Sequence, residues 1–471
     1  MVNLSHVLRG TAISQLLALL STPLLTRLYT PSEFGAYSVF VAAVSILGAT
    51  SCFRYELAIP LEKKNKQANY LVGLCITFLI IYIFLLSLIL LFCIDELASH
   101  GVDGVLIYML PISVFSVGVL KIGSNILVRD HNFLWLGWIK VIQTSSTSIV
   151  QLLGNKYGAL GLIIGFVLGQ LSAIVLNFYK AKYSRSPTCT QHFSKYTFIV
   201  RKYKNFPLYS APEVLLSTLS LNSVPLIILV IFGPVEAGLF ALAQKVGATP
   251  ISMLGNAISQ VFLGDVKNKI DRGELSSFVY KYLGLMTALL FPSAALLIFS
   301  LPIIFEFIFG PNWARAGTLL QLVLPWMLLK LIASPLSIIF NALLQNHKGL
   351  IWQFLFVIFR VMAISIALAV DANINLFVNL FSIASSLAYV VLVLWICRVI
   401  SCSVTRLLRD NIRYLLVSFI FSLIGMLMNE LYVGGLLSTM GLSLLILSLM
   451  LLWTLTVLTC DWRKGGVTRD L

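Results

Sequence analysis

Eight charged side chains lie inside otherwise apolar stretches of this sequence, and they are the residues best suited to chemistry. They are the bases Arg54, Lys121, Lys140, Lys245, Lys330 and Arg360 and the acids Glu56 and Glu213. A charge at membrane depth is costly and marks a substrate or ion pathway by default. Two carboxylates cannot neutralise six cations, so the excess predicts a hydrated cationic cavity or an anionic ligand.

Several of these charges join rows of hydroxyl and amide side chains spaced three or four residues apart, which puts each row on one helix face. Such rows also occur as packing seams between membrane helices, but a charge in the row favours a water-lined face. We therefore expect five polar residues in the cavity: Glu56, Glu213, Asn256, Ser334 and Ser337. The rows are Lys245, Thr249, Ser252, Asn256 and Ser259; Lys330, Ser334, Ser337 and Asn341; Lys140, Thr144, Thr147 and Gln151; and Ser210, Glu213, Ser217 and Ser220.

Two of the acidic positions carry specific expectations. Arg54 and Glu56 are two residues apart and do not share a face of the predicted helix, so a direct ion pair between them is not expected. Glu213 falls in the first turns of its span, where the helix dipole stabilises a carboxylate. A proton-coupling role for Glu213 is the alternative.

The elements that position these residues are predicted to be membrane-spanning helices. The 471 residues are 59% hydrophobic and 11% charged, whereas an ordinary soluble domain is about 25% charged. This composition excludes a soluble enzyme and a disordered chain. A span needs ~20 apolar residues, and fourteen candidates are found near 7–28, 36–60, 70–94, 104–127, 134–154, 158–179, 208–232, 237–263, 278–305, 318–341, 350–370, 374–397, 414–432 and 435–459.

The distribution of Lys and Arg predicts the orientation. Alternate loops and the C-terminal tail hold 22 of these residues, while the opposite loops hold only Arg27, Lys156 and Arg315. By the positive-inside rule both termini are expected on the cytoplasmic side of the membrane. The basic segment 181–207 suits contact with anionic lipid. Nucleic acid is not an expected partner, and no loop is long enough for a catalytic domain.

A sequence repeat predicts two related halves. The pattern S-x-P-L-[LI] followed by [YF]-x-P-x-E-x-G-x-[YF] occurs at Ser21–Tyr37 and again at Ser223–Phe240. Each copy is interpreted as a helix end, a proline-led turn and a glycine where the next helix starts close by. We expect six-helix lobes at 1–180 and 208–400, related by a pseudo-two-fold axis along the membrane normal. The linker is 181–207, and the two remaining helices with the tail lie in 401–471.

These segments together resemble one family. They are LLTRLYTPSEFGAYSVF (24–40), FRYELAIPL (53–61), YKNFPLYSAPEVLLSTLS (203–220), FGPVEAGLFALAQKVGATPISMLGNAISQVF (232–262) and FGPNWARAG (309–317). The sequence is similar to the polysaccharide transport branch, which includes O-antigen and exopolysaccharide flippases, of the multidrug/oligosaccharidyl-lipid/polysaccharide exporter superfamily. The resemblance covers roughly residues 5–400 and implies an all-α fold with a central cavity.

The resemblance also implies a substrate and a mechanism. The substrate would be an undecaprenyl-diphosphate-linked oligosaccharide, moved by alternating access from the cytoplasmic to the periplasmic leaflet of the bacterial inner membrane. The cavity cations would hold its diphosphate. The positions that match cavity arginines of related flippases are Arg54 and Lys245, and a lysine at the second lacks the bidentate fork of arginine. A monomer is expected, with the pathway's polymerase and chain-length regulator as candidate partners.

Other functions remain open from the sequence. A lipid II-type flippase is chemically close, while a drug/cation antiporter of the same fold would favour intramembrane acids. A polymerase or glycosyltransferase would need a large extramembrane loop or a carboxylate cluster, so no enzyme is expected. No cofactor is expected either, and Na⁺, H⁺ or the membrane potential could drive transport.

Overall fold

The structure, a computed structural model, describes residues 2–99, 104–182, 193–343, 345–433 and 438–463. Within these ranges every regular element is helical, as the sequence predicts. Ten of the described helices are long and apolar enough to cross a membrane, and a shorter apolar helix covers Leu444–Thr459. Each of the fourteen predicted spans falls on a helix, but α1, α5 and α9 reach spanning length with a more polar composition.

The chain divides into two compact units, Met1–Ala241 and Leu242–Leu471. The division falls inside helix α9 (Pro234–Asp271) and not in the predicted linker. In unit 1, α8 packs against α2, which joins the start of the second repeat to the first half of the chain. The part of the predicted linker at 183–192 lies outside the described residues.

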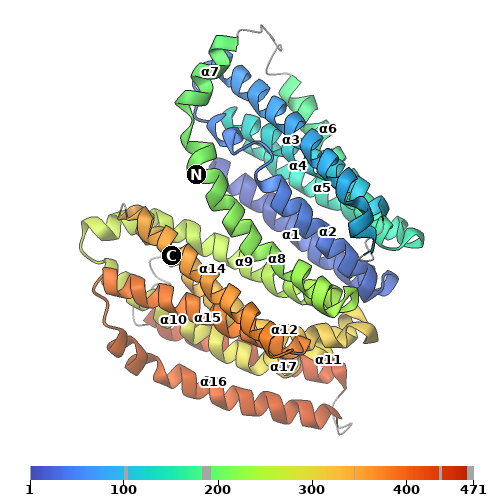
Figure 1. Ribbon diagram of the computed structural model, residues 1–471. Helices are drawn as coiled ribbons and strands as arrows, with labels where there is room; N and C mark the ends of the chain where they lie inside the picture. The colour runs from blue at the N-terminus through green and yellow to red at the C-terminus, as the bar shows by residue number, and fades with distance from the viewer. Residues whose placement is uncertain (1, 100–103, 183–192, 344, 434–437, 464–471) are drawn as a thin grey trace. The chain divides into compact units, whose positions relative to one another are not determined.

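Unit 1 is a bundle in which α5 packs against both α1 and α6, while α2 contacts α4 and α8 (Figure 1). One buried apolar cluster, around Leu71 and Leu79 of α3, also contains Ile199 of α7. The elements are α1 (Val2–Leu28), α2 (Pro31–Ala49), η1 (Tyr55–Ala58), α3 (Asn65–Ser99), α4 (Gly104–Arg129), α5 (Phe133–Leu153), η2 (Asn155–Tyr157), α6 (Ala159–Lys182), α7 (Phe193–Lys202), η3 (Phe206–Ser210), α8 (Ala211–Phe232) and the start of α9.

In both copies of the repeat a proline begins the second helix, and the two copies meet each other. Thr30 and Glu33 form a capping box at the start of α2, with Pro31 in its first turn. The second turn is made by Gly233, whose φ of 86° suits a residue without Cβ, and Pro234 begins α9. A methyl group on Gly35 would collide with the carbonyl oxygen of Pro234, and one on Gly238 would collide with that of Pro31. This reciprocal contact fits two repeats related by a pseudo-two-fold axis.

Two members of the polar row on α5, Thr147 and Gln151, pack against α6. Gln151 is buried, and its amide donates a hydrogen bond of 2.9 Å to the carbonyl of Leu162 on α6. A methyl group on Gly169 of α6 would collide with Thr147 Oγ1. These two residues therefore contribute to helix packing, because small residues on α6 let the hydroxyl-bearing face of α5 approach closely.

In unit 2, α10 packs against α16, and α15 packs against both α12 and α14 (Figure 1). The predicted span 278–305 is two helices: α10 ends at Ile298, and α11 starts at Leu301 with Pro302 in its first turn. From Leu242 of α9 onward the elements are α10 (Leu275–Ile298), α11 (Leu301–Phe309), η4 (Pro311–Trp313), α12 (Ala314–Leu336), α13 (Ile338–Ala342), α14 (Asn346–Ala369), α15 (Ile374–Val399), α16 (Val404–Val433) and α17 (Thr439–Arg463).

Candidate functional site

A cavity of about 390 Å³ lies in unit 2 between α9 and α12. It is built on helical spacing, because residues three and four apart project from the same face of each helix. Two predicted cavity cations, Lys245 and Lys330, both line it. The lining residues are Lys245, Ala248, Thr249, Ile251, Ser252, Gly255, Asn256 and Ser259 of α9, and Trp326, Met327, Lys330 and Ser334 of α12.

The lining of this cavity is cationic and rich in hydrogen-bonding groups. Both lysines are partly buried, and no acidic side chain is among the lining residues. Thr249 Oγ1 donates to the carbonyl of Lys245 at 2.6 Å, so its oxygen can still accept a hydrogen bond from a ligand. The arrangement favours an anion that also carries hydroxyl groups.

Two of the three other polar residues predicted for this region line the cavity, and one does not. Asn256 and Ser334 line the cavity as expected. Ser337 is not among the lining residues; its hydroxyl donates to the carbonyl of Ser334 at 2.7 Å, at the C-terminal end of α12. The prediction that Ser337 supplies a cavity group was wrong, because the helix ends there and the side chain closes its last turn.

Arg360 on α14 is buried in an aromatic cage. Its Cζ lies 4.1 Å from the ring centroid of Phe356, 4.6 Å from that of Phe381 and 5.4 Å from that of Trp326. Its Nε donates to Ser385 Oγ at 3.1 Å. Only 4% of the residue is exposed, so Arg360 is held among rings and is not a residue of the cavity wall.

Trp326 connects the cage to the cavity, and sequence reasoning missed it. Two cations lie near its ring, with Lys330 Nζ 6.0 Å and Arg360 Cζ 5.4 Å from the ring centroid. Its indole Nε1 is buried and has no hydrogen-bond partner among the described residues. The signal was present in the sequence, because Trp326 precedes Lys330 by one helical turn and so shares its face.

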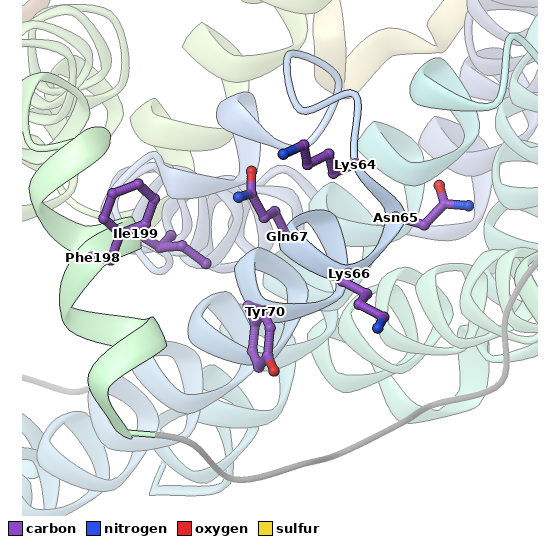
Figure 2. A pocket seen from close by; sticks show the side chains of 7 residues that line it. All are labelled: Lys64, Asn65, Lys66, Gln67, Tyr70, Phe198 and Ile199. Carbon is purple, nitrogen blue, oxygen red and sulfur yellow. The ribbon is translucent and has the colours of Figure 1, made fainter.

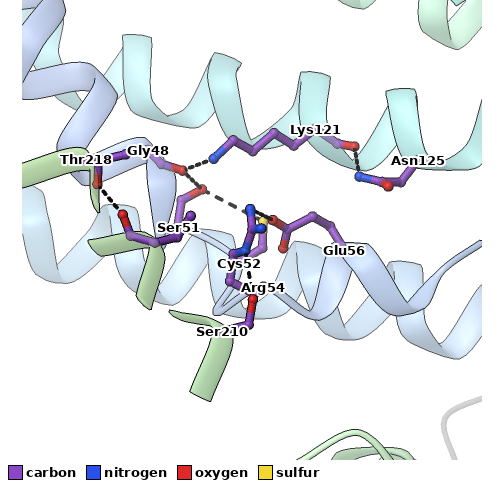
Figure 3. A network of polar contacts seen from close by, with 10 residues as sticks. Gly48, Ser51, Cys52, Arg54, Glu56, Lys121, Asn125, Ser210 and Thr218 are labelled. Atoms are coloured by element: carbon purple, nitrogen blue, oxygen red, sulfur yellow. Dashed lines mark hydrogen bonds and ion pairs between the residues drawn. The ribbon is translucent and has the colours of Figure 1, made fainter. Parts of the chain in front are cut away.

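Unit 1 contains a second basic cluster (Figure 3). Arg54 Nη1 lies 3.8 Å from Glu56 Oε1, and Arg54 Nε donates to Ser210 Oγ at 3.5 Å. Lys121 Nζ, from α4, donates to the carbonyl of Gly48 at 2.5 Å. The carboxylate of Glu56 is 2% exposed, and Glu56 compensates part of the local positive charge.

Two predictions from the sequence were wrong for this segment. The span predicted over 36–60 ends as a helix at Ala49, and Phe53 and Arg54 adopt φ values of 49° and 65°, which a right-handed helix cannot contain. Glu56 follows in a short 3₁₀ turn, so the helical spacing argument did not apply. Arg54 and Glu56 therefore form the ion pair that was not expected.

Lys140 and Glu213 of unit 1 do not take part in the contacts of the Arg54 cluster that are described above. Lys140 on α5 donates to Thr11 Oγ1 of α1 at 2.9 Å and so belongs to the seam between these two helices. Glu213 lies in the first turn of α8, as predicted, and its side chain is exposed. Among the described residues there is no group of three or more His, Cys, Asp and Glu side chains that could hold a metal ion.

The family assignment follows from the comparison with known families. The pattern of a family described as polysaccharide biosynthesis protein matches residues 24–317, which is more than half of the chain. The chain belongs to this family. No curated protein matches the sequence. The matched residues of the polysaccharide biosynthesis family include both repeat turns, the Arg54 cluster and Lys245.

Solved structures of transporters share the fold of this family member. A lipid II flippase MurJ in an inward closed conformation is similar with a TM-score of 0.73, 16% sequence identity, and coverage of 97% of this chain and 98% of that one. A multidrug resistance MATE family transporter of the MOP superfamily gives a TM-score of 0.62 at 15% identity, covering 84% and 94%. A MOP superfamily transporter from Pyrococcus furiosus gives 0.55 at 13%, covering 85% and 95%. The chain is therefore a multi-pass membrane protein with the MOP fold.

Proposed function

We propose that this protein is a flippase that moves an undecaprenyl-diphosphate-linked oligosaccharide across the bacterial inner membrane for polysaccharide biosynthesis. The observation that carries the proposal is the cavity of α9 and α12, where Lys245 and Lys330 stand without an acidic residue in the lining. Membership of the polysaccharide biosynthesis family and the MOP fold support a transport role.

The cavity lining matches the two chemical parts of such a substrate. Diphosphate oxygens carry negative charge and form charge-assisted hydrogen bonds with ammonium groups, which are stronger than neutral ones. Sugar hydroxyls pair with the hydroxyl and amide groups of Thr249, Asn256 and Ser334. Lysine offers a compact charge with rotatable donors and no rigid fork, so these residues would follow a diphosphate that changes position as it is moved. No covalent bond needs to form or break.

The same electrostatics argue against an antiporter for cationic drugs. A cation entering the cavity would meet two lysines, and like charges brought together in a poorly solvated site discriminate strongly against such a ligand. In unit 1, Arg54 is partly offset by Glu56 at 3.8 Å, whereas no carboxylate lines the unit 2 cavity. We therefore assign the main anion contact to Lys245 and Lys330 and a secondary one to Arg54 and Lys121.

The direction of transport and the partners follow from the same proposal. The positive-inside rule assigns the basic loops to the cytoplasm. Lipid-linked oligosaccharides would enter from that side and leave at the periplasmic leaflet. A polymerase and a chain-length regulator would then act on the product. The driving force, whether Na⁺, H⁺ or the membrane potential, is varied separately in the vesicle experiment described next.

Reconstitution into vesicles tests the proposal. Vesicles containing an undecaprenyl-diphosphate oligosaccharide with a fluorescent sugar are treated with a membrane-impermeant quencher, and the protein should make the inner-leaflet pool accessible. Lys245→Gln and Lys330→Gln should each slow this at least about tenfold, since a hydrogen bond to a charged group contributes about 1.5–3 kcal/mol. Lys156→Gln, at an exposed loop residue, should leave the rate unchanged.

Two comparison substrates make the result decisive. Lipid II in place of the oligosaccharide lipid tests the neighbouring flippase function, and a fluorescent organic cation tests drug transport. Equal rates for wild type and for vesicles without protein, or rates that both lysine variants leave unchanged, would contradict the proposal. Transport of the cation in preference to either diphosphate lipid would replace the flippase with an antiporter.

A further inference from the structure

A second cavity lies in unit 1, and none of its lining residues belongs to the unit 2 cavity or to the Arg54 cluster. It has a volume of about 630 Å³ and lies between helix α7 and the beginning of α3 (Figure 2). Its lining residues are Lys64, Asn65, Lys66, Gln67, Tyr70, Phe198 and Ile199. We name these seven residues the α3–α7 groove.

The two walls of the groove differ in chemistry. Lys64, directly before α3, and Lys66, in its first turn, are exposed, while α7 contributes Phe198 and Ile199. In Figure 2 the two sets lie on either side of Gln67. Phe198 is 57% exposed, although it is a large apolar side chain. No acidic residue is part of the lining. The groove thus offers two cations beside an uncovered aromatic surface.

The acid nearest to these lysines in sequence is already engaged. Glu62 Oε2 accepts from Lys202 Nζ at 2.5 Å and from Tyr203 Oη at 2.7 Å, and the side chain is 6% exposed. Its charge is matched by Lys202, so it does not neutralise Lys64 or Lys66. The positive charge of the groove is therefore available to a ligand.

Two sets of contacts hold the groove in shape. Arg129 of α4 donates to the carbonyls of Glu62 and Lys63 at 2.9 and 3.3 Å and to Asn65 Oδ1 at 2.8 Å. The rings of Tyr70 and Tyr196 meet edge to face with centroids 5.6 Å apart, which joins α3 to α7. Since the walls are fixed before a ligand arrives, little ordering free energy opposes binding.

The position of the groove identifies the kind of ligand. The apolar span of α3 covers Asn65–Phe92, so the lysines lie at its polar end and Tyr70 lies where the apolar part begins. At this depth lysines face phospholipid headgroups, and an exposed aromatic side chain inserts between them and the acyl chains. The loops at this end of the bundle are the basic ones, which the positive-inside rule assigns to the leaflet rich in anionic lipid.

We propose that the α3–α7 groove binds an anionic phospholipid of the membrane, with its phosphate at Lys64 and Lys66 and its glycerol and upper acyl chain against Phe198 and Tyr70. A soluble phosphate would contact only the lysines and would make no use of the aromatic wall formed by Phe198 and Tyr70. The site is distinct from the unit 2 cavity, and its test does not depend on the identity of the transported substrate.

Lipid binding to the purified full chain tests this. The protein is placed in nanodiscs of phosphatidylcholine with increasing fractions of fluorescent phosphatidylglycerol, and energy transfer from the protein's tryptophans reports binding. Lys64→Gln/Lys66→Gln should weaken the phosphatidylglycerol affinity at least about tenfold, because each lysine near an anionic surface contributes about 1 kcal/mol. Lys63→Gln/Lys204→Gln removes the same charge from exposed residues outside the lining and should change the affinity less than about threefold.

Three outcomes would overturn the proposal. Equal losses in the two double variants would mean diffuse surface charge and no specific groove. Equal affinity for phosphatidylcholine and phosphatidylglycerol in the wild type would mean that no anionic lipid is recognised. Displacement of the lipid by millimolar inorganic phosphate would mean a soluble anion site. Phe198→Ser should also weaken binding of the lipid, and an unchanged affinity would remove the aromatic wall from the site.

Discussion

Gly35 of α2 and Gly238 of α9 occupy equivalent positions in the two repeats, and each lies against the proline carbonyl of the other's turn. Gly35 meets Pro234, and Gly238 meets Pro31, so the contact is the same when the two copies are exchanged. The glycines are required because the obstacle is backbone oxygen, which cannot move aside as a flexible side chain can. The repeat motif therefore encodes a contact between its own two copies.

Gly35→Ala and Gly238→Ala should each destabilise the protein, although alanine normally stabilises a helix interior by about 1 kcal/mol. The added methyl group would force the two turns apart, and overpacking of this kind costs about 1–3 kcal/mol. Scanning fluorimetry in detergent should show a lower apparent Tm for both variants. Gly349→Ala is the control, since a methyl group there meets nothing within 4 Å, and its Tm should stay equal or rise. A Tm for Gly35→Ala matching that control would contradict the close contact.

The two cavity lysines should lower the stability of the fold that carries them. Lys245 and Lys330 are partly desolvated without a carboxylate in the cavity lining, and a cation at membrane depth costs up to about 3 kcal/mol. Lys245→Met and Lys330→Met should raise the apparent Tm while they reduce binding of diphosphate lipid. Such a trade-off between stability and function is expected at a binding site. If both substitutions lower the Tm, the lysines are structural and the cavity assignment fails.

Substitution of Arg360 should lower the stability, in contrast to substitution of the cavity lysines, because the environment of Arg360 stabilises its charge. Its guanidinium stacks on Phe356 at 4.1 Å and bonds Ser385, and lysine cannot reproduce the planar stack or the Nε contact. Arg360→Lys should lower the stability by about 2 kcal/mol, from the lost desolvated cation–π contact and hydrogen bond. Lys330→Arg, at the cavity wall, should leave the Tm nearly unchanged. A larger loss of Tm for Lys330→Arg than for Arg360→Lys would show that Arg360 faces water.

The sequence predicted the parts of this protein that depend on hydrophobic runs and on local motifs. The spans, the turn at Pro31 and the shared face of Lys245 and Asn256 follow from residues near each other in the chain. The end of α2 at Ala49 could not be predicted, since the chain stays largely apolar from Cys52 to Pro60 and hydropathy does not report where φ becomes positive. Hydropathy finds membrane-spanning stretches, not local backbone geometry.

Contacts between helices distant in sequence were also beyond prediction. The α5 row was interpreted as water-lined, because the glycines that receive Thr147 and Gln151 lie on α6 and nothing in α5 points to them. Arg360 was expected in the cavity, yet its cage is assembled from α12, α14 and α15. Periodicity identifies which residues share a face, but only packing decides whether that face meets water, lipid or another helix.

The contact of Glu62 with Lys202 and Tyr203, which fixes α7 beside α3, should depend on pH in a defined window. Burial raises the pKa of Glu62, but the hydrogen bonds from Lys202 and Tyr203 outweigh burial and lower it. The bond to Glu62 raises the pKa of Lys202. Stability from a carboxylate with a lowered pKa is complete above its unfolded pKa of about 4.3 and is lost as the pH falls through the folded value. Stability from a lysine with a raised pKa is complete below about 10.4 and is lost as the pH rises through the folded value.

Glu62→Gln should therefore lower the apparent Tm by the same amount from about pH 5 to pH 10, and the difference from wild type should shrink below about pH 4. Lys202 is 38% exposed, so solvent screening keeps the ion pair's own contribution small, and most of the difference comes from the two hydrogen bonds. Glu274→Gln is the matched control, because the Glu274 side chain is 51% exposed and pairs with Lys269 at 3.2 Å on the surface. It should change the Tm little at any pH. A difference for Glu62→Gln that persists undiminished at pH 3.5 would mean that the carboxylate charge does not hold α7 in place.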